Sequence, residues 1–234
     1  MVMTANSRCP AVMYGVAQKA SRKPSMSAAQ HVKYLTQSGG KRNGCPCEVI
    51  GDAAHLLRIE ICHADRACLA RLHRFVEAVK SGKARAVGVA NFSADQMRRI
   101  ANHLARAGVQ LAANQVNYSL LRRAAETNGV LEACRELDVA LVAYFPLASG
   151  RLTQPSDSMG TKALLSCLAD VAHAHDASII QVALNWLLAR DSHVIPIPGA
   201  TKPHHARANL DALGWRLSET EFDAIDRASA KSGT

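Results

Sequence analysis

The clearest pattern along the chain is a repeated switch between short apolar runs and longer stripes of apolar residues at helical spacing. Residues 69–79 carry apolar side chains at positions i, i+3, i+6, i+7 and i+10, and this stripe stops at Ser81 and Gly82. The spacing is typical of a helix with one buried face and a glycine at its end. Residues 84–91, which read ARAVGVAN, then have the character of a buried strand.

The same switch recurs to the end of the chain. Ser93 is a suitable N-cap for a helix that ends at Gly108. Ser218, followed three residues later by Glu221, predicts a capping box on the last helix. Further strands are predicted at residues 110–119, 140–144 and 193–197, and further helices at residues 130–137, 162–175, 178–190 and 202–213.

Strands that alternate with helices over short loops indicate a parallel sheet covered by helices. Half of an eight-fold barrel and part of an open doubly wound sheet both have this pattern. The predicted strands end in polar or aromatic residues, namely Asn91, Gln115, Asn117 and Tyr144. Such ends favour the barrel, whose ligands bind at the carboxyl ends of its strands. No GxGxxG segment follows any strand, so the usual dinucleotide loop of the open-sheet fold is missing.

Charge is distributed unevenly along the chain. The net charge is +9, but residues 1–47 contain seven Lys or Arg and no Asp or Glu, which leaves 21 basic and 19 acidic residues in the remainder. A nearly neutral remainder argues against a nucleic-acid partner, which calls for a basic surface. The basic leader has the composition of an organellar transit peptide, a composition that basic disordered tails share. We therefore expect a location in the cytoplasm or in an organelle such as a plastid or mitochondrion.

Cysteine usage and hydropathy exclude further classes of protein. The seven cysteines are scattered and odd in number, which favours a reducing compartment over a disulfide framework. Cys45, Cys47 and Cys62 lack the second clean pair of a zinc site, so we predict no metal. No apolar run approaches the roughly 20 residues needed to cross a bilayer, so no membrane partner is expected. His173 and His175 lie in an alternating Ala/His stretch and are expected at the surface.

Five segments are informative in their order along the chain: GKARAVGVANFS, AANQVNYSLL, VALVAYFPLASGRLT, SIIQVALNWLLAR and VIPIPGATKPHHARANL. Together they resemble the aldo-keto reductases, a family of NADPH-dependent enzymes built on a (β/α)8 barrel. The resemblance covers about residues 66–230 and implies an incomplete (β/α)8 TIM barrel, the second half of an aldo-keto reductase barrel. We divide the chain into a basic segment at residues 1–57, which is a leader or a degenerate first half, and a barrel portion at residues 58–234.

The resemblance implies that the strand ends bind the nicotinamide of NADP(H). Asn91 and Gln115 would hydrogen-bond the carboxamide, and Tyr144 would stack on the ring. Phe145 and Leu147 follow in the same cofactor-facing segment. Two family serines are replaced here, one by the alanine before Asn91 and one by Phe145, and each replacement removes a hydrogen bond to the cofactor. We therefore expect weakened cofactor binding.

The last of the five segments resembles the family's site for the cofactor phosphate. Gly199 would let the backbone approach the cofactor, while Thr201 and Lys202 at a helix start would receive the adenosine 2′-phosphate. Further phosphate and adenine contacts are implied for His205 and Asn209. A lysine at this position favours NADPH over NADH.

Carbonyl reduction in this family uses a Tyr that donates a proton, a Lys that lowers its pKa, an Asp that orients the Lys and a His that positions the carbonyl. RIEICHAD, residues 58–65, resembles the strand that carries the His and nominates His63. AVMYG and HVKYL nominate Tyr14 and Lys33. Cys9 stands where the family has the Asp, so the implied tetrad is incomplete.

Two functions follow from the resemblance. The first is an NADPH-dependent oxidoreductase that reduces small aldehydes or ketones to alcohols. The alternative is a catalytically impaired, cofactor-binding or truncated protein of the same family. A barrel without its first strands would leave sheet edges open, and we expect such edges to favour self-association.

Overall fold

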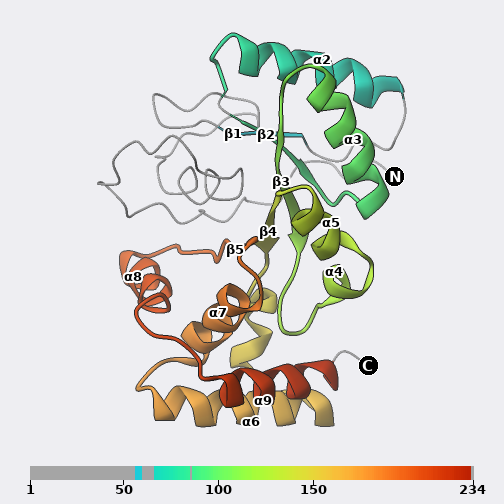
Figure 1. Cartoon of the computed structure of the whole chain (residues 1–234). Helices are drawn as coiled ribbons and strands as arrows, with labels where there is room; N and C mark the ends of the chain where they lie inside the picture. Colours follow the sequence, from blue (N-terminus) through green and yellow to red (C-terminus); the bar gives the residue numbers. More distant parts are fainter. Residues whose placement is uncertain (1–55, 60–65, 85, 233–234) are drawn as a thin grey trace.

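The computed structural model describes residues 56–59, 66–84 and 86–232. In this part of the chain one parallel sheet of five strands has the order β1-β2-β3-β4-β5 (Figure 1). The strands are β1 (Leu56–Ile59), β2 (Ala86–Ala90), β3 (Leu111–Asn117), β4 (Ala140–Tyr144) and β5 (Val194–Pro196). Each strand pairs with the next one along the chain, so the sheet advances in one direction. This is the arrangement of a barrel segment and confirms the predicted partial barrel.

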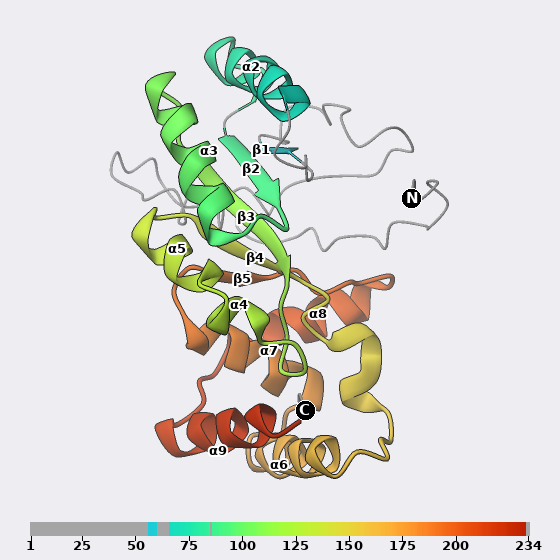
Figure 2. The same cartoon turned by 90° about the vertical axis from the view of Figure 1, so that its right-hand side faces the viewer.

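Helices connect the strands and extend beyond them. They are α2 (Arg66–Lys80), α3 (Ala94–Arg106), α4 (Ala124–Thr127), α5 (Val130–Glu136), η1 (Ala148–Thr153), α6 (Met159–Ala174), α7 (Ile179–Arg190), α8 (Pro203–Asp211) and α9 (Glu219–Ala230). Figures 1 and 2 show α2, α3 and α5 along one side of the sheet. In both views α6 and α9 lie side by side at the end of the molecule farthest from α2.

The elements agree with the sequence pattern where a periodic stripe or a cap marks them. Ser93 caps α3 as predicted, since its Oγ accepts a hydrogen bond from the Gln96 amide and the Gln96 side chain accepts one from the Ser93 amide. The capping box of Ser218 and Glu221 at the start of α9 is likewise confirmed. The pattern did not indicate α4 or η1, because helices this short carry no stripe.

The two faces of the sheet carry different side chains. On one face Val87, Val89, Leu141 and Val194 are buried in the main core together with apolar residues of the helices. The opposite face carries a smaller cluster of mostly small residues: Ala112, Ala113, Ala140, Val142 and Ile195. In this face Gly88 lies so near to β3 that a Cβ there would stand 3.2 Å from the Ala113 carbonyl oxygen. In β4 the alternation follows from the two-residue repeat of a strand, whereas Ala112 and Ala113 are consecutive residues of β3 at a register shift in its pairing with β2.

One expectation for the surface is wrong. His173 is exposed as predicted, but the side chain of His175 is only 27% exposed. Its Nε2 lies 2.7 Å from Glu221 Oε1, and its ring stacks on Trp215 with the ring centres 4.3 Å apart. The end of α6 meets the start of α9 at this point, a contact that local sequence does not encode. Within the described ranges, no helix is both long enough and apolar enough to cross a membrane.

Candidate functional site

The polar residues at the ends of the strands gather at one edge of the sheet. The strand register pairs Ala90 with Gln115 and Asn117 with Tyr144, so β2, β3 and β4 end nearly level with one another. Asn91 follows directly after β2. Because all these strands are parallel, their carboxyl ends form a common edge, which is the ligand-binding side of barrel folds. We call it the carboxyl edge.

Hydrogen bonds join three residues of the carboxyl edge. Tyr144 Oη donates to Asn91 Oδ1 at 3.0 Å, and the backbone amide of Asn91 donates to the backbone carbonyl oxygen of Gln115 at 2.8 Å. Asn91 has a φ of 57°, in the left-handed region that asparagine adopts more readily than most residues. The structure therefore brings together the three residues that the sequence nominates for nicotinamide binding.

The chain leaves β4 through several residues with left-handed backbones. Phe145, Ala148 and Ser149 have φ angles of 51°, 50° and 58°. The Phe145 side chain is 50% exposed and meets the Tyr144 ring edge to face, with the ring centres 5.3 Å apart. Leu147 instead packs, partly buried, against the main core. At the position where the family has a serine, this chain thus presents a half-exposed aromatic ring at the carboxyl edge.

The segment after β5 is held beside the end of β4. The Ile197 amide donates to the Ala143 carbonyl oxygen at 3.0 Å, which extends the pairing of the two strands toward the carboxyl edge. Gly199, Thr201 and Lys202 follow on the surface. Lys202 is the N-cap residue of α8, and its side chain makes no capping hydrogen bond to the helix.

The start of α8 suits an anion. Pro203 begins the helix, no acidic residue lies in its first turn, and Lys202 adds a positive charge beside the partly positive helix end. His205 is exposed and meets the His204 ring edge to face at 4.4 Å, whereas Asn209 is only 8% exposed. Amides, an aromatic ring and a cationic helix start are groups that could hold the carboxamide, the ring and a phosphate of a nicotinamide dinucleotide.

The nominated catalytic residues lie outside the described part of the chain. They are Tyr14, Lys33 and His63, and Cys9 lies outside it as well. The same holds for Cys45, Cys47 and Cys62. Among the described residues, no three His, Cys, Asp or Glu side chains come together in a way that could hold a metal ion.

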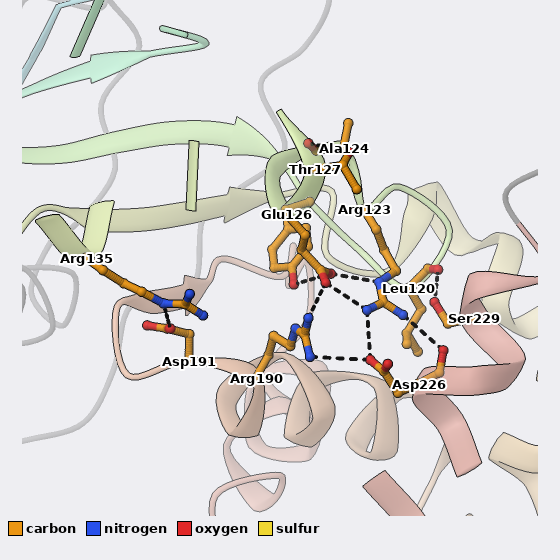
Figure 3. A network of polar contacts seen from close by, with 11 residues as sticks. Leu120, Arg123, Ala124, Glu126, Thr127, Arg135, Arg190, Asp191, Asp226 and Ser229 are labelled. Carbon is orange, nitrogen blue, oxygen red and sulfur yellow. Dashed lines mark hydrogen bonds and ion pairs between the residues drawn. The ribbon is translucent and has the colours of Figure 1, made fainter. Parts of the chain in front are cut away.

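A partly buried polar network that the sequence reasoning missed lies beside α4 (Figure 3). Arg123 Nε donates to Glu126 Oε1 at 2.7 Å, and Arg123 Nη2 pairs with Asp226 Oδ1 at 2.8 Å. Arg190 also donates to Glu126, and Tyr118 Oη donates to Glu126 Oε1 at 2.8 Å. The network joins the segment after β3 to the end of α7 and to α9.

Electrostatics in this network favour a charged carboxylate. Burial by itself would raise the pKa of Glu126, but hydrogen bonds from Arg123 and Tyr118 outweigh burial and hold that pKa below its usual range. The pKa of Tyr118 is raised, first by burial and then by the negative charge of Glu126. Arg123 and Glu126 lie three residues apart, a spacing that could have suggested an ion pair. Asp226, 103 positions away, had no such signal.

Comparison with known proteins identifies related chains. A family model described as Aldo/keto reductase family matches residues 55–230. The chain is 32% identical over 173 residues to Pyridoxal reductase, chloroplastic, of Arabidopsis thaliana. This match covers 67% of this chain and 47% of the relative. Over 149 residues it is 34% identical to 6-dehydroglucose reductase of Novosphingobium aromaticivorans, a match that covers 64% of this chain and 48% of the relative.

A solved structure has the same fold over most of the chain. It is a thermostable aldo-keto reductase in complex with the inhibitor epalrestat, with a TM-score of 0.64 and 31% identity, covering 75% of this chain and 60% of that one. The chain spans about half the length of the curated relatives it matches. These matches confirm the resemblance drawn from the five sequence segments and the partial barrel that it implied.

Proposed function

The chain belongs to the aldo/keto reductase family, and from this premise we propose that it binds NADPH and reduces small aldehydes or ketones to alcohols. The observation that carries the proposal is the side-chain hydrogen bond between Tyr144 and Asn91 at the carboxyl edge, where Gln115 bonds to Asn91 through the backbone. The Asn91 side-chain amide and the Tyr144 ring match the two chemical features of a nicotinamide, its carboxamide and its flat ring, and Gln115 lies on the neighbouring strand.

Each residue has a distinct part in this proposal. Asn91 and Gln115 orient the carboxamide, and this selects the ring face turned to the substrate. Tyr144 supports that ring from the opposite face. Thr201 and Lys202 hold the 2′-phosphate at the start of α8, so NADPH is preferred to NADH. When bound, the cofactor supplies the hydride.

The proton and the carbonyl contacts are proposed for residues outside the described part. Tyr14 donates the proton, Lys33 lowers the pKa of that tyrosine, and His63 positions the carbonyl oxygen. The substrate class is a small carbonyl compound. Pyridoxal is the first compound to test, because it is the substrate that the name of the Arabidopsis thaliana relative gives.

Titration of the purified chain with NADPH and with NADH tests the proposal. Intrinsic fluorescence reports binding, and 4-nitrobenzaldehyde or pyridoxal is then added to the same cuvette while NADPH absorbance is followed. We expect tighter binding of NADPH than of NADH, followed by oxidation. Absence of NADPH binding at any accessible protein concentration would rule the proposal out.

A second function is favoured by one residue that departs from the family pattern. Cys9 stands where the resemblance places the aspartate. Under this reading the chain binds NADPH without turnover and acts as a binding protein. Saturable binding in the titration, with no oxidation after an aldehyde is added, distinguishes this function from the reductase.

We also propose that the chain associates with itself. Within the described residues, β1 and β5 are the two ends of the sheet, and each pairs with one neighbouring strand. Unpaired strand edges attract further strands. Light scattering after size-exclusion chromatography is expected to give a mass above the 25.1 kDa of one chain, and a strictly monomeric mass would contradict this proposal.

For the compartment, we propose an organelle rather than the cytoplasm. The acid-free basic composition of residues 1–47 supports it, and the Arabidopsis thaliana relative is named as chloroplastic. A fusion of residues 1–57 to a fluorescent protein tests this directly. A diffuse cytoplasmic signal would refute it.

A further inference from the structure

A continuous series of contacts runs from the last helix to the carboxyl edge. It begins with Asp226 on α9, which pairs with Arg123 at 2.8 Å and also accepts from Arg123 Nη1 through its backbone oxygen at 3.0 Å. Arg123 in turn holds Glu126 through Nε and Nη2, each at 2.7 Å (Figure 3). A guanidinium that binds a carboxylate with two parallel hydrogen bonds fixes its orientation as well as its position.

Tyr118 carries the series from the network to the edge. Its Oη donates to Glu126, and its backbone amide donates to the Tyr144 carbonyl oxygen at 3.3 Å. Tyr144 then donates to Asn91 as described above. The side chain of Tyr118 is fully buried, with its ring centre 6.3 Å from that of Trp186. Because the hydrogen bond joins the backbones of Tyr118 and Tyr144, a displacement of Tyr118 would also displace Tyr144.

We propose that Tyr118, Arg123, Glu126 and Asp226 are positioning residues for the nicotinamide site. They touch neither cofactor nor substrate; they hold Tyr144 and Asn91 in the arrangement in which one presents its ring and the other its amide. The consequence for NADPH rests on the proposed function, whereas the effect on Tyr144 does not. Under this proposal, the packing of α9 influences the affinity for NADPH indirectly, through Asp226, Arg123 and the residues that follow them in the series.

The alternative is that the network only fastens α9 to the rest of the molecule. In that case a change at Arg123 lowers the free energy of unfolding and leaves Tyr144 where it is. The two readings differ in the surroundings of one side chain, so a measurement at Tyr144 separates them.

The test uses fluorine NMR of the chain labelled with 3-fluorotyrosine. The sequence has four tyrosines, and the Tyr144 signal is assigned by its loss in Tyr144→Phe. Arg123→Lys keeps the charge and removes the planar fork. Its matched control is Arg98→Lys, because Arg98 pairs with Glu136 at 2.8 Å on the surface, with its side chain 39% exposed. Spectra are recorded well below the melting temperature of every variant.

We expect Arg123→Lys to shift the Tyr144 signal by more than its linewidth and Arg98→Lys to leave it in place. NADPH affinity should fall by about fivefold in Arg123→Lys and stay within about twofold in the control. An unmoved Tyr144 signal in a destabilised Arg123→Lys would overturn the proposal. If Arg123→Lys does not fold, Tyr118→Phe removes a single oxygen from the same series and decides in its place.

If the unmodified chain does not bind NADPH, the proposed function fails while the Tyr144 signal still decides this inference. A shifted signal would then show that the network positions Tyr144 in a chain without cofactor affinity.

Discussion

Replacement of Glu126 by Gln is expected to destabilise the fold far more than a comparable change at a surface ion pair. The Glu126 side chain is 10% exposed and accepts hydrogen bonds from three side chains, those of Tyr118, Arg123 and Arg190. Glu126→Gln keeps the size of the residue but removes the negative charge. Two guanidinium groups then stand against a neutral amide that can donate as well as accept.

The magnitude follows from how far the cations are buried. Removal of one partner of a fully buried ion pair costs about 3–5 kcal/mol. Here the Arg123 and Arg190 side chains are 18% and 27% exposed, and both keep Asp226 as a partner. Water and the second carboxylate therefore offset part of the loss, and we expect a decrease in the free energy of unfolding of about 2 kcal/mol.

Urea denaturation at pH 7, followed by tryptophan fluorescence, measures this change. Trp186 is a local reporter, because the Arg123 guanidinium lies 5.0 Å from its ring centre. With a slope of about 2 kcal/mol per molar urea, the midpoint should fall by about 1 M. The control Glu136→Gln removes a half-exposed partner of Arg98 and should cost under about 1 kcal/mol. Equal midpoints for the two variants would refute the reasoning.

The same variant has a defined pH dependence. The folded state holds the pKa of Glu126 below its usual range, so its charge stabilises the fold at pH values above the unfolded pKa. That stabilisation is lost as the pH falls through the lower, folded pKa. The difference in unfolding free energy between the unmodified chain and Glu126→Gln should therefore shrink in acid, and a difference that grows in acid would contradict the assigned direction.

Three further changes have expected outcomes. Gly160→Ala should lower the melting temperature by several degrees in a calorimetric scan, because the added Cβ would clash with the Lys231 carbonyl oxygen where α6 packs on α9. An unchanged melting temperature would show that α6 and α9 can move apart at this point without loss of stability. Lys202→Ala should weaken NADPH binding about tenfold and NADH binding little, since one phosphate contact is lost; equal effects on both would count against a phosphate site. Burial, followed by the negative charge of Asp191, raises the pKa of the Cys134 thiol to about 12, so alkylation at pH 8 with peptide mapping should find Cys134 modified only after unfolding.

Much of the fold could be predicted because its signals are local. The strand predicted at residues 140–144 matches β4, and the one at residues 110–119 contains β3 with one or two extra residues at each end. Ser93 and Ser218 mark helix starts because a cap is a contact between residues three apart. The convergence of Asn91, Gln115 and Tyr144 followed from the parallel arrangement, which places successive strand ends at one edge.

The parts that were missed depend on contacts between distant segments. Asp226 and Arg123 are 103 positions apart, and nothing in either segment indicates the other. His175 was expected at the surface, but the packing of α6 on α9 brings Glu221 and Trp215 against it. The helices α4 and η1 are too short for a periodic pattern, and η1 contains Ala148 and Ser149, whose left-handed backbone angles their side-chain types did not suggest.

Hydrogen–deuterium exchange with and without NADPH tests most directly whether the carboxyl edge is a cofactor site. It requires no turnover and locates binding along the chain. We expect slower exchange, when NADPH is present, in peptides that contain Asn91, Gln115, Tyr144 and residues 199–205. Unchanged exchange in these four segments at saturating NADPH, or protection confined to α2 and α3, would contradict the assignment of the site.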